Sequence, residues 1–264
     1  MTRTCIVLAL LLVAIPAWTV DKLIALTFDD GPRPYVLFGT KTPPTPGLLG
    51  VLDQNGVKAT FFVMGWRLTA GTHGDRREID IGMSCRDAAE QVLRRGHEIE
   101  NHTFSHVELG TAEKRKGEAW VIRDVEHGAQ VIRELGVQPQ YVRPPDWVLP
   151  QDARHELERR GYQILTISAE NPLARRDVNS LDYLCAGAHP AHCPQPSLTA
   201  AVLKQLEQRE KKGVYTHILA FHELSTTTAI LPDLIAELKA RGYRFVRLDE
   251  YMKRVGTAPS GAAK

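Results

Sequence analysis

The chain contains 264 residues, of which 43% are hydrophobic and 24% are charged. These values are typical of one globular domain of barrel or doubly wound size. A formal net charge of +2 at pH 7 is too small to indicate a nucleic-acid partner.

The first 20 residues differ from the rest of the chain. Arg3 precedes an apolar run over residues 5–18 that is too short to span a bilayer comfortably. This pattern predicts a secretory signal peptide over residues 1–20, cleaved after Ala17 or Thr19, and a secreted or periplasmic protein. The alternative is an uncleaved anchor formed by residues 5–18, and only then do we expect contact with a membrane. In both cases the remainder of the chain meets an oxidising compartment.

Removal of the signal peptide leaves three cysteines, an odd number for an exported protein. Cys185 and Cys193 flank a short loop, and we expect them to form a disulfide. Cys85 then remains as a small core residue or a single thiol. An alternative zinc site would join the first two cysteines to His189 and His192, but its spacing matches no common ligand pattern.

One pattern recurs six times along the chain: an amphipathic, helix-like run ends at a glycine and a β-rich run follows. With the first apolar run included, the expected strands are Leu23 to Phe28, Ala59 to Met64, His97 to Asn101, Tyr141 to Arg143, Tyr162 to Ser168, Thr216 to His222 and Tyr243 to Arg247. Strands that alternate with helices favour a parallel sheet, and seven or eight such units favour a closed or nearly closed barrel. A doubly wound open sheet is the alternative, but no glycine-rich phosphate loop follows the first strand.

The connections after the strands are long, whereas those before them are tight. The long segments run from Arg33 to Pro46, from Gly65 to Met83 and from Asn171 to Pro196. In barrels the carboxyl ends of the strands carry the active site. We therefore expect the functional residues at these ends.

Two adjacent carboxylates, Asp29 and Asp30, end the first strand. Neighbouring acids at the mouth of a buried strand repel each other and are costly to desolvate unless a cation neutralises one of them. A bound metal is the simplest such cation. The alternative is an Asp-Gly turn in which Asp30 ties down its own loop backbone.

His102 and His106 follow the third expected strand and lie four residues apart. If the loop enters a helical turn there, both imidazoles project from one face and can share a metal. Together with an aspartate from another strand end, they form a set of two histidines and one carboxylate with open positions, as in catalytic zinc sites. The alternative is a pair of exposed loop histidines.

Two further strands end in residues capable of catalysis. Arg143 ends its strand before Pro144 and Pro145, and its alternative role is a surface ion pair. His222 ends the apolar strand from Thr216, and its alternative role is a hydrogen-bonded core histidine.

These motifs, in this order, resemble those of the polysaccharide deacetylase family of carbohydrate esterases. They are TFDDGP from Thr27, HTFSH from His102, RPP from Arg143 and LAFH from Leu219. The resemblance runs from about Leu23 to Tyr251. It implies a distorted, incomplete (β/α) barrel with about seven parallel strands over residues 21–255, followed by a flexible tail over 256–264. It also implies hydrolysis of N-acetyl groups from amino-sugar residues of a polysaccharide such as peptidoglycan or chitin-like oligomers.

The resemblance further implies one divalent metal ion, for which zinc is expected, and an acetylated glycan as partner. The implied roles are metal ligation by Asp30, His102 and His106, general base catalysis by Asp29, orientation of that base by Arg143, and proton donation by His222. The backbone N–H of Asp146 would meet the oxyanion, and Trp147 would line the substrate subsite.

Two positions depart from the family pattern. An aromatic residue usually follows the double proline, whereas this chain has Asp146 and Trp147. The usual carboxylate and tryptophan after the fifth strand are absent, and Glu170 stands nearby, with Asp177 further on. Because burial and a metal both lower the pKa of His222, a general acid there needs an anion beside it. We expect Glu170 to be this auxiliary carboxylate, since Asp177 would have to fold back from its loop.

Other functions remain open at this point. The chain could be a deacylase or amidohydrolase of the same family that acts on a small non-polysaccharide amide, or a catalytically silent carbohydrate-binding protein. Retention of Asp29 beside the three ligands argues against a pure binder, which needs no base. A zinc-storage role has only the cluster between Cys185 and Cys193 in its favour.

Overall fold

The computed structural model describes residues 21–41, 46–69, 81–166, 177–185 and 195–256. The expected signal peptide over residues 1–20, residues 257–264 of the expected tail, and Glu170 lie outside these ranges. The described strands are β1 (Leu23–Gly31), β2 (Thr60–Val63), β3 (Glu98–Asn101), β4 (Tyr141–Val142), β5 (Gln163–Ile164), β6 (Asp177–Asn179), β7 (Thr216–His222) and β8 (Arg244–Val246).

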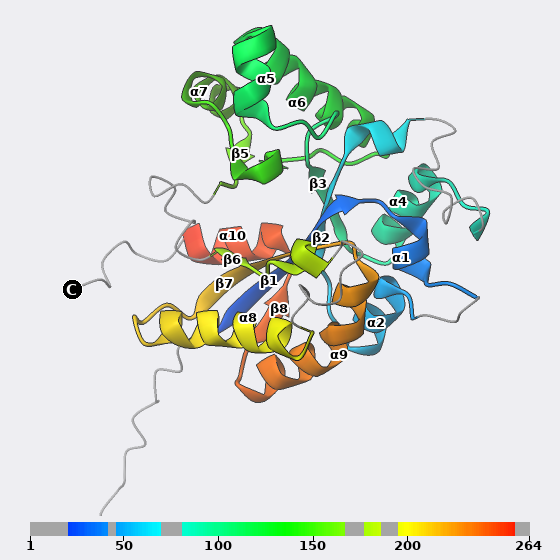
Figure 1. Cartoon of the computed structure of the whole chain (residues 1–264), viewed down its shortest axis with the longest axis vertical. Coiled ribbons are helices and arrows are strands. Elements are labelled where there is room, and N and C mark those ends of the chain that lie inside the picture. The colour runs from blue at the N-terminus through cyan, green and yellow to red at the C-terminus, as the bar shows by residue number, and fades with distance from the viewer. Residues whose placement is uncertain (1–20, 42–45, 70–80, 167–176, 186–194, 257–264) are drawn as a thin grey trace, which may run out of the picture.

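Helices connect these strands and cover the outside of the sheet (Figure 1). The α-helices are α1 (Pro34–Phe38), α2 (Leu48–Gln54), α4 (Cys85–Arg94), α5 (Leu109–Lys116), α6 (Glu118–Arg133), α7 (Gln151–Arg159), α8 (Gln195–Glu210), α9 (Ser225–Ala240) and α10 (Leu248–Gly256). Short 3-10 turns are η1 (Gly65–Leu68), η2 (Pro145–Trp147) and η3 (Asp182–Cys185).

The sheet is entirely parallel, with strand order β5-β4-β3-β2-β1-β7-β6. β8 pairs with the first half of β1, whereas β2 pairs with its second half, so the sheet curls around β1. This confirms the expected incomplete (β/α) barrel. Every expected strand is present, and β6 adds one within the long segment from Asn171 to Pro196.

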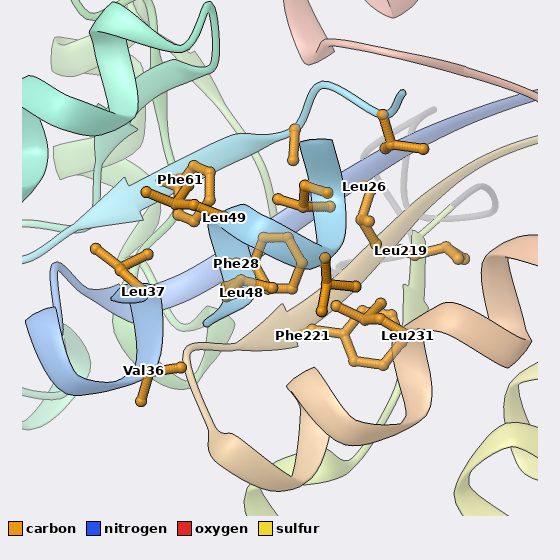
Figure 2. Packing of buried hydrophobic residues seen from close by; sticks show 14 of the residues in the cluster. Leu26, Phe28, Val36, Leu37, Leu48, Leu49, Phe61, Leu219, Phe221 and Leu231 are labelled. Carbon is orange, nitrogen blue, oxygen red and sulfur yellow. The ribbon is translucent and has the colours of Figure 1, made fainter. Parts of the chain in front are cut away.

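Alternation along β1 divides its side chains between two environments. Ile24, Leu26 and Phe28 belong to the hydrophobic cluster beneath the helices, where the Phe28 ring stacks on Phe61 with centroids 5.2 Å apart (Figure 2). The odd-numbered residues face the barrel interior. The β1 strand is thus anchored by one face while Asp29, on the other face, points into the barrel.

A register irregularity between Phe28 and Gly31 explains how two adjacent acids reach the same site. Strict alternation would turn Asp30 away from Asp29. The β1–β2 pairing slips at this point, and Asp30 has a left-handed φ of 69°. This local bulge re-aims the Asp30 side chain toward the end of the barrel.

Candidate active site

A cavity of about 390 Å³ opens at the carboxyl ends of the strands, the end predicted to carry function. Its lining residues come from the carboxyl ends of β1, β6 and β7 and from the loops after β3, β4 and β6. They are Asp29, Asp30, His102, His106, Pro144, Asp146, Trp147, Asn179, Tyr183 and His222. The cavity therefore collects all three expected metal ligands, the expected base and the expected acid.

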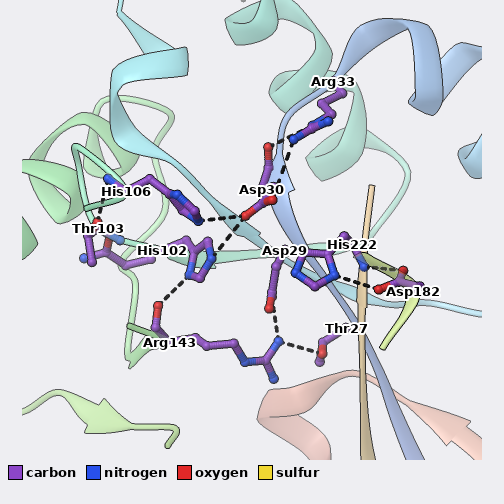
Figure 3. A network of polar contacts seen from close by, with 11 residues as sticks. Thr27, Asp29, Asp30, Arg33, His102, Thr103, His106, Arg143, Asp182 and His222 are labelled. Carbon is purple, nitrogen blue, oxygen red and sulfur yellow. Dashed lines mark hydrogen bonds and ion pairs between the residues drawn. The ribbon is translucent and has the colours of Figure 1, made fainter. Parts of the chain in front are cut away.

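The side chain of Asp30 converges with both histidines (Figure 3). Its Oδ1 lies 2.9 Å from Nε2 of His106 and 3.4 Å from Nε2 of His102. This buried oxygen nevertheless makes no hydrogen bond within the described ranges. One potential ligand atom from each residue lies within 4.8 Å of the others. Atoms this close without hydrogen-bond geometry point toward a shared centre, as ligands of a cation do.

A hydrogen bond fixes the ring of His102. Its Nδ1 lies 2.6 Å from the backbone oxygen of Arg143. A carbonyl oxygen only accepts, so Nδ1 carries the proton and Nε2 presents its lone pair toward Asp30. Metal-binding histidines usually have such a partner on the second ring nitrogen.

His102 and His106 are brought together by an irregular loop and not by the expected helical turn. Residues 102–106 form no helix, and Thr103 and His106 instead adopt left-handed φ values of 66° and 57°. The backbone N–H of His106 donates to Thr103 Oγ1 at 3.1 Å, and the two imidazole rings meet edge to face at 4.9 Å. The four-residue spacing correctly predicted that the two imidazoles lie close together, but a loop with left-handed residues holds them there.

The electrostatics of Asp30, His102 and His106 are compatible with binding of a divalent cation. Burial alone would raise the pKa of Asp30, but contact with His102 and His106 outweighs burial and holds that pKa well below its usual range. Burial alone would lower the pKa of His106, and Asp30 outweighs it in the opposite direction. One carboxylate and two imidazoles with space on the cavity side form the donor set of an open catalytic metal site.

The second carboxylate, Asp29, binds Arg143 instead. Nη1 of Arg143 donates to Asp29 Oδ1 at 2.6 Å and to Thr27 Oγ1 at 2.8 Å (Figure 3). Asp29 is 3% exposed and Arg143 is 0% exposed. The ring centroids of Phe62 and Trp147 lie 4.1 Å and 4.7 Å from the guanidinium carbon. Arg143 is therefore a buried partner of Asp29 and not a surface ion pair.

The carboxylate that contacts His222 belongs to Asp182, which the sequence analysis did not single out. Its Oδ1 lies 2.7 Å from His222 Nδ1, and its Oδ2 accepts the backbone N–H of His222 at 2.8 Å. Burial alone would lower the pKa of His222, but the Asp182 hydrogen bond and the charges of Asp29, Asp182 and Asp30 raise it to about 9. The need for an anion beside His222 is met without Glu170, which lies outside the described residues.

The sequence analysis found no carboxylate and aromatic residue of the family pattern after the fifth strand, but the structure shows such a pair further along the chain. Asp182 and Tyr183 follow β6, and the Tyr183 ring lies edge to face with His222 at 5.6 Å. They escaped notice because β6 has only three residues and because tyrosine stands where tryptophan was expected. An acid followed by an aromatic residue within the long segment was the available signal. Asp177, the other candidate, lies buried on β6.

Strained backbone concentrates around the cavity. Asp146 and Trp147, expected at the oxyanion site and the subsite wall, have φ values of 53° and 60°. The non-glycine residues with positive φ in the described chain are Asp30, Thr103, His106, Asp146, Trp147 and Leu181. All lie within two residues of a cavity-lining residue. Such conformations are costly and cluster at functional sites, where the surrounding structure enforces them.

The cysteines agree in part with the expected pairing. Cys185 is disulfide-bonded. Cys85 is buried and remains a thiol, whose sulfur lies 3.8 Å from Nη1 of Arg67. Cys193, the expected partner of Cys185, and both histidines of the alternative zinc cluster lie outside the described residues.

Comparison with known proteins gives consistent results. A family model described as polysaccharide deacetylase matches residues 18–165, more than half of the chain. A peptidoglycan-N-acetylglucosamine deacetylase of Bacillus cereus is 26% identical over 233 residues, covering 88% of this chain and 89% of the relative. A chitin deacetylase of Colletotrichum lindemuthianum is 28% identical over 244 residues, covering 91% and 82%.

Solved structures share the fold. The Xyl-CE4 domain of a multidomain xylanase from the hindgut metagenome of Trinervitermes trinervoides superposes with a TM-score of 0.61 at 22% identity, covering 91% of this chain and 94% of that domain. Peptidoglycan deacetylase PdaC from Bacillus subtilis gives 0.60 at 20% identity, covering 89% and 92%. With the matching family model and relatives that align along most of their length, the chain belongs to the polysaccharide deacetylase family of hydrolases.

Proposed function

We propose that the protein removes N-acetyl groups from amino-sugar residues of a polysaccharide, such as peptidoglycan or a chitin-like oligomer, with the help of one zinc ion. The observation that carries this proposal is a single cavity that contains a three-residue ligand set, a buried base and an acid with its own carboxylate. The names of the two relatives, one a peptidoglycan deacetylase and one a chitin deacetylase, support the substrate class.

Asp30, His102 and His106 would hold the metal. A divalent ion bound there supplies Lewis acidity, which polarises the amide carbonyl and lowers the pKa of a water molecule toward neutrality. The chain's own contribution is rigidity. The Arg143 carbonyl fixes the His102 ring, and the strained loop fixes His106.

Asp29 acts as the general base. As the attacking water forms its bond to the acetyl carbon, the Asp29 carboxylate takes up the water proton. Arg143 holds this carboxylate in place through Nη1, and Thr27 Oγ1 accepts a second hydrogen bond from the same nitrogen, which positions the guanidinium. Asp29 also lines the cavity, so the carboxylate held in this way is placed to accept the water proton.

His222 acts as the general acid. The His222 Nδ1–H donates a hydrogen bond to the Asp182 carboxylate, which leaves Nε2 directed at the cavity. When the C–N bond breaks, Nε2 donates a proton to the leaving nitrogen, so that acetate and a free amine are produced. The backbone N–H of Asp146 stabilises the charge that develops on the carbonyl oxygen.

Apolar and aromatic side chains around the cavity support a sugar substrate longer than one unit. Trp147 and Tyr183 line the cavity and offer flat surfaces to the C–H faces of a sugar ring. The exposed large apolar residues of the described chain are Val107, Val148, Leu181, Tyr183 and Leu184. All belong to the loops after β3, β4 and β6, beside the cavity.

We further propose that the protein is exported from the cytoplasm. The sequence pattern over residues 1–20 supports a signal peptide, and a disulfide at Cys185 supports an oxidising compartment. None of the described helices is long and apolar enough to cross a membrane.

Acetate release from peptidoglycan, chitin oligomers and acetylated xylan, measured side by side, tests this function. We expect release from at least one glycan containing N-acetylated amino sugars, loss of release with a chelator, and recovery with zinc. A small N-acetylated amine serves as the comparison. Preference for that amine would favour the small-amide alternative. Glycan binding without release by the metal-loaded protein would favour the silent binding protein.

A further inference from the structure

Asp177 is a buried carboxylate that the proposed mechanism leaves without a role. It begins β6 and is 3% exposed. Neither of its carboxylate oxygens has a hydrogen-bond partner, and no other carboxylate in the described chain has both oxygens buried in this way. A buried acid without partners is strongly disfavoured unless a nearby cation or ordered water compensates.

Strand register places Asp177 inside the barrel. Asn179, two residues later on β6, lines the catalytic cavity. Alternate residues of a strand share a face, so Asp177 faces the same interior one layer deeper. It pairs with Ile218 of β7, which pairs with Ala25 of β1. Ala25 is two residues before Thr27, so Asp177 lies one layer below the hydroxyl that contacts Arg143.

One edge of the Arg143 guanidinium, formed by Nε and Nη2, has no hydrogen-bond acceptor among the described residues. Its Nη1 binds Asp29 and Thr27, whereas Nε and Nη2 are buried without a hydrogen-bond partner among the described residues. The rings of Phe62 and Trp147 pack against the guanidinium. Guanidinium N–H groups donate in their own plane, so these two nitrogens require acceptors at the edge and not above the ring faces.

The charges around Asp177 agree with this geometry. Arg143, directly after β4, and Arg209 from α8 favour the ionised form of Asp177, whereas Asp29 from β1 opposes it. Tyr251 of α10 acts on Arg209. Burial outweighs the two arginines and raises the pKa of Asp177 to about 7. Arg143 is the cation with the largest effect on this pKa.

We propose that Asp177 is a positioning residue for the catalytic base: buried water links its carboxylate to the free edge of the Arg143 guanidinium and keeps Nη1 aimed at Asp29. Unsatisfied donors and acceptors of opposite charge share one interior, and a buried water needs two to four such polar partners. The proposal rests on the proposed function in one respect, that Asp29 is the base. It assigns Asp177 a role beside Arg143 and not beside His222.

A double-mutant cycle on the metal-loaded full chain tests whether Asp177 acts through Arg143. We expect Asp177→Asn to lower kcat about tenfold with little change in KM, and to cost less than about threefold in an Arg143→Lys background, where the guanidinium edge is absent. Glu100→Gln is the matched control. Glu100 is also buried, but one of its oxygens accepts the backbone N–H groups of Gln140 and Tyr141. Its effect should be the same in both backgrounds. Equal losses from Asp177→Asn in both backgrounds would overturn the inference.

A second readout does not depend on activity. In the metal-loaded protein without substrate, NMR should show the Arg143 Nε–H exchanging with solvent about tenfold faster in Asp177→Asn, and unchanged in Glu100→Gln. Unchanged Nε–H exchange in Asp177→Asn would limit Asp177 to a structural role, even if the Tm of the variant fell.

The two readouts separate failure of this inference from failure of the proposed function. Faster Nε–H exchange in a protein that deacetylates no glycan would retain the positioning role and reject the function. Normal acetate release, unchanged Arg143 Nε–H exchange in Asp177→Asn and equal effects of Asp177→Asn in both backgrounds would retain the function and reject the positioning role.

Discussion

The carboxylate of Asp182 binds both the ring and the backbone of His222. One oxygen contacts Nδ1 at 2.7 Å and the other accepts the backbone N–H at 2.8 Å. Asp182 is 0% exposed, so its negative charge acts on the imidazole with little screening. This contact fixes which nitrogen faces the cavity and raises the pKa of His222 to about 9, together with the charges of Asp29 and Asp30 and against the effect of burial.

Asp182→Asn should therefore move the alkaline limb of the kcat/KM profile. A general acid works while protonated, so activity persists up to its pKa and falls above it. Loss of the carboxylate removes the largest upward effect on the pKa of His222, and the limb should move to lower pH by about one unit or more. Metal content should not change. Glu170→Gln is the comparison: a shift there and none in Asp182→Asn would return the role to Glu170.

The sequence revealed the parts of the site that adjoin long, regular strands. Asp29, Asp30 and His222 were found because β1 and β7 are continuous apolar runs that end at them. Asp182 was missed because β6 is too short to show a period, and its place beside β7 depends on pairing between Asp177 and Ile218. The residues of β6 alone do not indicate which residues of β7 they pair with.

Backbone conformation was the other property that sequence patterns did not convey. The spacing of His102 and His106 suggested a helical turn, yet left-handed residues in an irregular loop bring them together. The adjacency of Asp29 and Asp30 suggested a shared site, yet only the slip between β1 and β2 turns both toward it. Tertiary packing imposes these conformations, because residues with a Cβ rarely adopt them on their own.

The two adjacent aspartates should differ when each is changed to asparagine. Asp30→Asn should lose metal, since Asp30 supplies the anionic ligand. Asp29→Asn should keep the metal and lose about 10² to 10⁴ in kcat, since a base acts in the transition state. Metal analysis and acetate release on the same preparations check this. Equal metal loss in both variants would mean that the carboxylates share the ligand role.

One histidine variant separates specific from adventitious metal binding. His106→Ala should reduce bound zinc well below one ion per chain, because it removes one of three ligands. His155→Ala is the control, since His155 is an exposed residue of α7. Metal content that is the same in both variants would remove His106 from the ligand set.

Cys185 should be joined to Cys193 in the exported protein. Cys185 is disulfide-bonded, and the expected signal peptide removes the cysteine at position 5 on cleavage. Peptide mapping by mass spectrometry without reduction should find this link and a thiol at Cys85. A link between Cys85 and either residue would contradict the assignment.

Gly31 should be sensitive to substitution, because a side chain there has no room. A Cβ at Gly31 would lie 1.7 Å from Oε1 of Glu223, which is 0% exposed. The other oxygen of Glu223 accepts the backbone N–H of Arg33 at 2.7 Å and holds the loop that follows Asp30. Gly31→Ala must therefore displace either the Glu223 carboxylate or the loop that carries a metal ligand.

We expect Gly31→Ala to lower the free energy of unfolding by about 1 to 3 kcal/mol and to weaken zinc binding. Gly50→Ala is the control, because Gly50 lies in α2 and an added Cβ meets nothing within 4 Å. That change should raise the free energy of unfolding by about 0.5 to 1 kcal/mol, since alanine favours a helix over glycine. Denaturant unfolding and zinc titration of both variants measure the effects. A Gly31→Ala protein with unchanged stability and zinc affinity would show that Glu223 yields to the methyl group and does not hold the Asp30 loop in place.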